Sequence, residues 1–154
     1  MAFDYQSFKN EFPYFKSPNA VVYLDNAATA LKPQALIDAT STFYQSAGSV
    51  HRSQYEAAQT AQYENARHLV KTLINAEDEK AVIWTSGTTH SINLVANSLL
   101  PSLHADDEIL ISQAEHHANF VTWHEIAKKC GAKIKVLPIL DNWLIDENAL
   151  IAAL

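Results

Sequence analysis

The chain has 154 residues, of which 48% are hydrophobic and 18% are charged, and its formal net charge is -6. This balance is typical of a folded globular protein and excludes a disordered or fibrous one. Its 11 basic residues are scattered among 17 acidic ones, so no basic surface for nucleic acid is expected. No apolar run approaches the ~20 residues that cross a bilayer, and the N-terminus lacks a signal-peptide pattern. We therefore expect a cytoplasmic protein that does not bind membranes.

Helix and strand patterns alternate along the chain without a repeat, a low-complexity tract or a flexible linker. Apolar residues recur every three or four positions in the helical segments, whereas the strand segments are short runs of strand-forming residues. This alternation predicts an α/β protein with a mostly parallel sheet covered by helices. In chain order, the sequence predicts a helix from 4 to about 12, a strand over 21–24, a helix from 33 to about 46, a helix from about 53 to 75, a strand over 81–85, a helix capped by residue 88 or 89, a strand over 108–112, a helix over 119–130, a strand over 133–137 and a helix that begins at 146.

Two loops that follow strands carry the residues best suited to chemistry. Residues 86–89, Ser-Gly-Thr-Thr, precede a helix, where unpaired backbone N–H groups and the helix dipole favour an anion such as phosphate. The alternative is an ordinary turn capped by threonine. His116 and His117 occupy the equivalent loop after the next strand, and their alternative is a pair of partly exposed loop histidines. Because ligands of open α/β sheets bind at the carboxyl edge, both loops indicate one site.

Two other loops are less specific. Arg52, which follows His51, could bind a carboxylate or phosphate with two hydrogen bonds, or it could be solvated surface. Residues 25–29, Asp-Asn-Ala-Ala-Thr, are small residues after a strand and permit close approach of a ligand or a neighbouring chain. The same segment is equally well explained as an Asx-type turn.

A metal site is the next possibility to weigh. His117 and His124 lie seven residues apart, hence two helical turns, which is too far for both to bind one ion. No His-Glu-x-x-His pattern occurs. The sequence therefore predicts no metal site, although ligand types suited to zinc occur in Glu115, His116, His117, His124 and Glu125.

Cys130 is the one cysteine, so the chain forms no intramolecular disulfide and no cysteine-rich metal site. Gly131 directly follows it and is typical of a helix C-cap. The pattern predicts a structural thiol in the last turn of a helix.

Taken in order, several segments resemble the cysteine desulfurase/selenocysteine lyase family of the class V aminotransferase group. They cover nearly the whole chain, and their shared order is far more specific than any one of them. The segments are 23–29 (Tyr-Leu-Asp-Asn-Ala-Ala-Thr), 50–52 (Val-His-Arg), 86–89 (Ser-Gly-Thr-Thr), 92–96 (Ile-Asn-Leu-Val-Ala) and 115–119 (Glu-His-His-Ala-Asn). The resemblance implies a homodimer with the aspartate-aminotransferase type of fold and pyridoxal phosphate (PLP) as cofactor. Residues 1–20 would be a helical N-terminal segment on the small-domain side, and residues 21–154 an incomplete PLP-binding large domain with three α/β/α layers.

The resemblance also implies roles for individual residues. Gly87, Thr88 and Thr89 match the phosphate-binding turn, and His116 matches the histidine that stacks over the pyridine ring and helps to move protons. The family commonly has an acidic residue where this chain has His90, which matches the helix dipole less well if protonated but could add a phosphate contact. Loops near the substrate and the dimer interface match Ala28, His51, Arg52 and Asn119.

The reaction that the resemblance implies removes sulfur from L-cysteine or L-selenocysteine. The products would be L-alanine and an enzyme persulfide, which a sulfur-acceptor protein takes up for iron–sulfur cluster assembly. The family's cofactor-binding lysine, pyridine aspartate, carboxylate arginine and persulfide cysteine match nothing in this chain. We therefore expect an inactive N-terminal fragment. Two alternatives stay open: another class V aminotransferase, or a truncated, non-catalytic paralogue that acts as an interaction module.

Overall fold

The structure, a computed structural model, describes residues 3–46, residue 50 and residues 57–154. Contacts divide the chain into two compact units, one up to residue 82 and one from residue 83 to residue 154. The predicted division into 1–20 and 21–154 stays a prediction. None of the described helices is long and apolar enough to cross a membrane.

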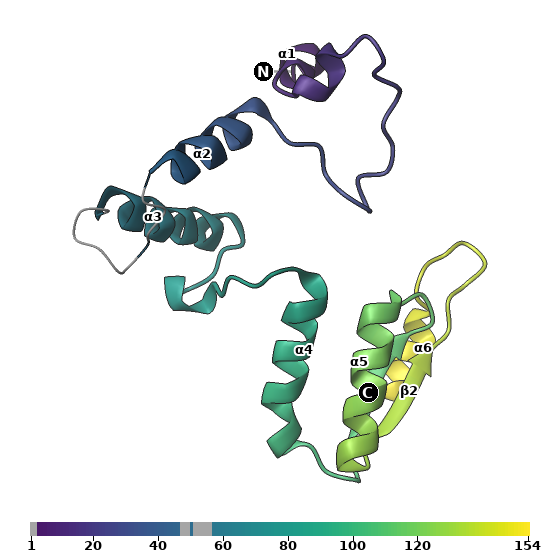
Figure 1. Cartoon of the computed structure of the whole chain (residues 1–154). Helices are drawn as coiled ribbons and strands as arrows, with labels where there is room; N and C mark the ends of the chain where they lie inside the picture. Colours follow the sequence, from purple (N-terminus) through teal and green to yellow (C-terminus); the bar gives the residue numbers. More distant parts are fainter. Residues whose placement is uncertain (1–2, 47–49, 51–56) are drawn as a thin grey trace. The chain divides into compact units, whose positions relative to one another are not determined.

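The first unit is helical. Asp4 caps its first helix as predicted, because the Asp4 carboxylate accepts hydrogen bonds from the N–H groups of Gln6 and Ser7. The predicted helix after Pro33 is also confirmed. Among the described residues, the elements of this unit are α1 (Tyr5–Asn10), the 3-10 helix η1 (Pro13–Lys16), α2 (Gln34–Gln45), α3 (Ala57–Leu73) and the 3-10 helix η3 (Glu79–Ala81) (Figure 1).

The predicted strand over 21–24 does not form. Val22 and Leu24 are 83% and 88% exposed, and the described residues contain one sheet, to which this segment does not belong. A strand needs a neighbour that supplies its ladder hydrogen bonds, so strand-forming residues alone do not make one. The segment is instead held at its edge by aromatic packing, in which the rings of Tyr14 and Tyr23 lie 5.8 Å apart.

The second unit contains the sheet. Strand β1 (Glu108–Ser112) and strand β2 (Lys133–Leu137) pair in parallel, and both have the predicted bounds. The crossover between them is α5 (His117–Cys130), so the three elements form a βαβ unit. The remaining elements are α4 (Thr88–Leu99), the 3-10 helix η4 (Leu100–Ser102) and α6 (Glu147–Ala153).

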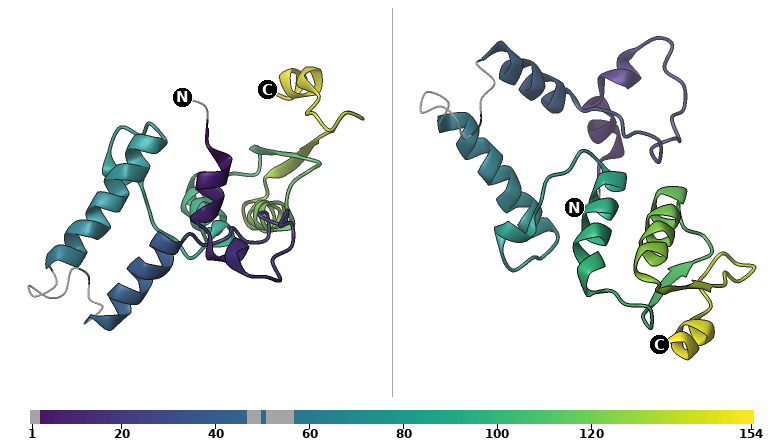
Figure 2. Two further views of the ribbon diagram at one scale, coloured as in Figure 1. Left: turned by 90° about the horizontal axis from the view of Figure 1, so that it is seen from above. Right: turned by 60° about the horizontal axis from the view of Figure 1, so that its bottom comes forward.

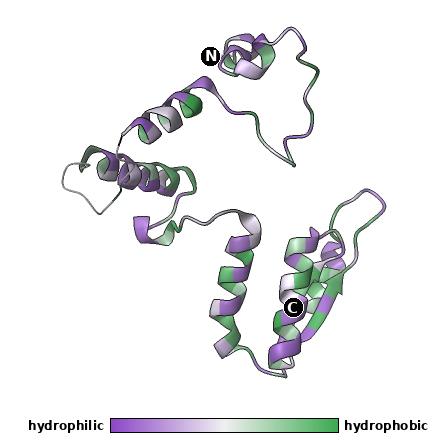
Figure 3. Ribbon diagram, in the orientation of Figure 1, coloured by the Kyte–Doolittle hydropathy of each residue, from purple (hydrophilic) through white to green (hydrophobic). Residues whose placement is uncertain are grey.

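Helices cover both faces of this small sheet. Both views of Figure 2 show β2 between α5 and α6, and α5 also contacts α4. In Figure 3, α4 and α5 each carry apolar and polar bands, as amphipathic helices do. The buried residues of the unit come from the facing surfaces of these elements: Ala96, Ile111, Thr122, Ile126, Ala127 and Leu137. The predicted α/β class with a parallel sheet is therefore confirmed, as part of a three-layer arrangement.

Three further predictions need correction, one about a strand and two about the start of a helix. The predicted strand over 81–85 does not form: residue 81 ends η3, and Ile83 is 66% exposed. Helix α4 is capped by Gly87, not by a threonine, because its φ of 146° and ψ of 174° are backbone angles that glycine adopts readily. Helix α5 begins at His117, two residues before the predicted start, since the imidazole of His116 supplies the N-cap acceptor.

A candidate cofactor site at the heads of two helices

The turn before α4 is held by side chains on both sides of Gly87. The N–H of Ser86 donates to Nδ1 of His90 at 3.3 Å, and the Ser86 hydroxyl lies 3.1 Å from the same nitrogen. The hydroxyls of Thr85 and Ser91 are 2.7 Å apart. Nδ1 of His90 therefore accepts from the N–H of the residue before the N-cap, whereas the glutamate of a capping box accepts from the N-cap residue itself.

These contacts leave the donors at the head of α4 available. Gly87 has no side chain to cap the helix, and within the described residues nothing accepts a hydrogen bond from the N–H groups of Thr88 or Thr89. Both threonine side chains are exposed. Free amide donors, two hydroxyls and the positive end of the helix dipole form a donor set that fits a phosphate group. The residues present thus fit the phosphate of PLP.

His116 stands at the head of α5. Its Nδ1 accepts a hydrogen bond from the N–H of Ala118 at 3.1 Å, which is an N-cap contact. Because Nδ1 is the acceptor, the proton of the neutral ring lies on Nε2, and that nitrogen has no hydrogen-bond partner among the described residues. Histidine is an uncommon N-cap, since serine, threonine, aspartate and asparagine are the preferred residues at this position.

Glu115, one residue earlier, is tied to the strand and to the helix. Its Oε1 accepts from the hydroxyl and the N–H of Ser112, at 2.7 and 3.3 Å, and its Oε2 accepts from Asn119 at 2.7 Å. The hydrogen bonds from Asn119 and then Ser112 hold the pKa of the Glu115 carboxyl below its ordinary value of 4.5, although burial opposes them. This contribution to stability is present above the ordinary value and is lost as the pH falls through the lowered pKa.

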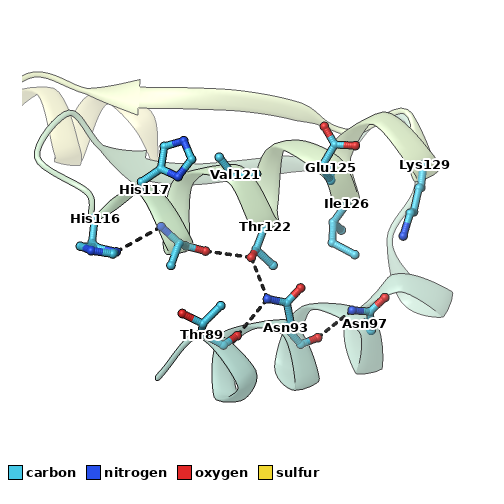
Figure 4. Close-up of a pocket in the computed structure, with 11 residues that line it drawn as sticks. Thr89, Asn93, Asn97, His116, His117, Val121, Thr122, Glu125, Ile126 and Lys129 are labelled. Atoms are coloured by element: carbon cyan, nitrogen blue, oxygen red, sulfur yellow. Dashed lines mark hydrogen bonds between the residues drawn. The ribbon is translucent and has the colours of Figure 1, made fainter. Parts of the chain in front are cut away.

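A groove of about 390 Å³ runs between α4 and α5, with Thr89 and His116 at the same end (Figure 4). The structure thus brings together two residues that the sequence predicted from separate loops. Other residues that line the groove are Asn93, Asn97, His117, Ala118, Val121, Thr122, Glu125, Ile126 and Lys129.

One polar contact fastens the two helices together. The amide of Asn93 donates to the carbonyl of Thr89 at 2.9 Å and to Oγ1 of Thr122 at 3.1 Å. The Thr122 hydroxyl in turn donates to the carbonyl of Ala118 at 2.8 Å, and the residue is 8% exposed. This link sets the spacing between the head of α4 and the head of α5.

We expect Thr122→Val to lower the free energy of unfolding by about 1–3 kcal/mol, since it keeps the shape but removes a buried acceptor. Thr72→Val is the matched control, because that exposed hydroxyl also donates to the carbonyl four residues earlier. It should change stability much less. Equilibrium urea unfolding measures both, and equal losses would show that the contact with Asn93 contributes nothing.

The other predicted site residues are spread over three parts of the chain. Ala28 lies in the first unit, in a turn where the N–H groups of residues 28 and 29 donate to the carbonyl of Asp25 at 3.1 and 3.2 Å. His51 and Arg52 lie outside the described residues. Asn119 is in the first turn of α5, where both ends of its amide are hydrogen-bonded.

Cys130 ends α5, as predicted, and Gly131 follows with a left-handed φ of 82°. The Cys130 thiol donates to the carbonyl of Ile126 at 3.2 Å. A helix rises about 1.5 Å per residue, so Cys130 lies roughly 20 Å along α5 from His116. Within the described ranges, no group of three or more metal-binding side chains could hold a metal ion.

The sequence analysis did not identify the hydrogen bonds that hold the turn before His116. Asn119 and Trp123 lie four residues apart on one face of α5, and Glu115 precedes Asn119 by the same spacing from just before the helix cap. These spacings were the available signal. The link between Asn93 and Thr122 joins residues 29 apart and has no local signal.

The parallel βαβ unit ends its first strand just before His116, and open α/β sheets bind their ligands at this carboxyl end of the strands. The family Aminotransferase class-V matches residues 22–154 of the chain. The chain therefore belongs to the class V aminotransferase family.

Individual relatives agree with this assignment. A probable cysteine desulfurase of Haemophilus influenzae is 76% identical over 95% of this chain and 33% of its own length. The crystal structure of cysteine desulfurase CsdA from Escherichia coli is 48% identical, with a TM-score of 0.85, over 100% of this chain and 39% of that one. A C-DES mutant with glycine covalently linked to its PLP cofactor shares the fold, at 22% identity and a TM-score of 0.66, over 85% of this chain and 33% of that one. The chain spans about a third of the length of the curated relatives it matches.

Proposed function

We propose that this chain supplies the N-terminal part of the PLP-binding domain of a cysteine desulfurase. The observation that carries the proposal is the 76% identity to a probable cysteine desulfurase over 95% of the chain. The site supports it, because a phosphate-suited turn and a histidine with a free Nε2 lie at one end of one groove. The complete enzyme would act as a homodimer in the cytoplasm.

The proposed reaction transfers the sulfur of L-cysteine to an enzyme thiol. The C–S bond of the substrate breaks, an S–S bond forms, and the products are L-alanine and a persulfide, which a sulfur-acceptor protein then takes up. Bound PLP would supply the means to stabilise negative charge at the substrate carbons. The role of L-selenocysteine as a second substrate stays a prediction.

Residues of this chain would hold the cofactor and handle one proton. The amides and hydroxyls of Thr88 and Thr89 would hold the phosphate, and Gly87 would let it approach the backbone. His116 would carry a proton on Nε2, which faces away from the capping contact at Nδ1. Cys130 would not accept sulfur, because its thiol lies at the far end of α5 and is bonded to that helix.

The test is the production of L-alanine from L-cysteine by the full-length protein that contains this segment. We expect alanine and, with a reducing agent, an equal amount of sulfide. Amino transfer from another amino acid without alanine formation would favour a different class V aminotransferase. A full-length protein that binds neither PLP nor cysteine would favour the interaction module.

The isolated 154-residue chain should show no desulfurase activity, because none of its lysines matches the family's cofactor-binding motif and its one thiol is remote from His116. Alanine release from cysteine by purified chain measures this. Activity that disappears in Cys130→Ser would contradict both the expectation and the assignment of Cys130 as structural.

A further inference from the structure

A series of hydrogen bonds joins residues on both sides of His116 in the sequence. It begins at the hydroxyl and N–H of Ser112, passes through Glu115 and Asn119, and ends at the indole of Trp123, whose Nε1 lies 2.9 Å from Oδ1 of Asn119. Glu115, Asn119 and Trp123 are half-buried, and none of them lines the groove. Any effect of these residues on the groove must therefore pass through a neighbouring residue.

The direction of every bond in this chain is fixed by chemistry. An indole N–H only donates, so the Asn119 atom facing Trp123 must be its oxygen. The Asn119 amine then faces Glu115 as a donor, and the other Glu115 oxygen receives the N–H of Ser112. Both Glu115 oxygens therefore accept, which suits an ionised carboxylate, because that group has only acceptors and no O–H donor to place. The lowered pKa of Glu115 agrees with this state.

The hydrogen bonds from Ser112 to Trp123 surround the position of His116 in the sequence. His116 directly follows Glu115 and caps the helix whose first two turns carry Asn119 and Trp123. Ser112 is the last residue of β1, so the hydrogen bonds join the strand end to the helix across the loop that contains His116. A shift of the loop would move Nε2 and break the capping contact at Nδ1.

We propose that Glu115, Asn119 and Trp123 are positioning residues, and that their one-way hydrogen-bond chain holds His116 in the orientation that the cofactor site requires. The proposal rests on the proposed function for its consequence in turnover. Its structural part, the direction of the bonds, stands without it.

Glu115→Gln tests the direction, because a carboxamide nearly matches glutamate in shape but presents one donor and one acceptor. Whichever way the new amide turns, it sets a donor against the amine of Asn119 or the N–H of Ser112. We expect turnover by the full-length holoenzyme to fall roughly 10-fold or more. Trp123→Phe alone removes one bond and should cost less.

The decisive variant combines Glu115→Gln with Trp123→Phe. Without the indole, the Asn119 amide can turn over and accept from the new amine, so the donor-to-donor clash with residue 115 is removed and the Asn119 amine faces the phenyl ring instead. We expect the double variant to recover to within a few-fold of Trp123→Phe alone. Glu115→Gln with Trp143→Phe is the matched control, since Trp143 is 85% exposed, and it should recover nothing.

A second readout is independent of activity. In the holoenzyme labelled with ¹⁵N-tryptophan, Glu115→Gln should speed hydrogen exchange of the Trp123 indole N–H and leave that of Trp143 unchanged. An unchanged Trp123 rate, or recovery by the Trp143 variant, would overturn the directional chain. Altered exchange with unchanged turnover would overturn the positioning role alone. Absence of desulfurase activity in the parent would instead overturn the proposed function, while the exchange result would still test the chain.

Discussion

His116→Ala in the full-length enzyme should reduce turnover by about 10²–10⁴-fold with PLP still bound, which is the range for loss of a positioned general acid or base. The free Nε2 of this ring is the atom that would move the proton, because Nδ1 is occupied by the N–H of Ala118. Steady-state alanine release and the absorbance of bound PLP measure the two quantities.

The capping role of His116 must be separated from its chemistry. Loss of an N-cap acceptor costs about 1 kcal/mol of stability, so His116→Ala should also lower the melting temperature. His116→Asn keeps an acceptor at the N-cap and should keep the stability, yet it should lose as much turnover as the alanine variant. A catalytically competent asparagine variant would show that His116 matters only for the helix.

His117→Ala is the matched control for the chemistry. The two rings point in different directions in Figure 4, with the ring of His116 lying at the end of the groove near Thr89. His117→Ala should therefore change turnover much less than His116→Ala. Equal losses from the two substitutions would make the assignment of His116 wrong, even though the family stands.

Much of the second unit could be predicted from the sequence, because its signals are local. Both strands of the parallel pair were predicted with their observed bounds, since each is a short run that contains three apolar residues and lies between turns. The left-handed Gly131 and the Asp146 cap follow from residue chemistry that acts within a few positions. Local signals also placed Thr89 and His116 at ends of elements that meet.

The failures have non-local causes. The runs 21–24 and 81–85 have strand-forming side chains, but a strand exists only when another strand completes its hydrogen bonds, and no described segment pairs with either. Propensity alone cannot supply that partner. The prediction of the α4 cap was wrong for a different reason. The sequence favoured a threonine as the N-cap, but the backbone angles at that position are ones that glycine adopts readily.

Gly87→Ala should weaken PLP binding by the full-length enzyme about 5- to 100-fold, because Gly87 has a φ of 146° and a ψ of 174°. Angles of this kind are essentially reserved for glycine and cost another residue about 1–3 kcal/mol. A Cβ at Gly87 would meet no atom within 4 Å, so the expected loss comes from the backbone alone. To relieve the strain, the turn would rotate the N–H groups of Thr88 and Thr89 away from the phosphate.

Gly131→Ala is the matched control, since Gly131 also has a positive φ, at 82°, and a Cβ there would lie 3.2 Å from that of Ala105. It is strained and crowded, but it lies at the opposite end of α5 from His116. We expect Gly131→Ala to lower the melting temperature and leave the PLP dissociation constant unchanged, whereas Gly87→Ala should raise that constant. Spectroscopic titration of the apoenzyme with PLP measures the constant for each variant. Equal weakening by both would indicate general destabilisation, and tight binding by Gly87→Ala would remove the turn from the phosphate site.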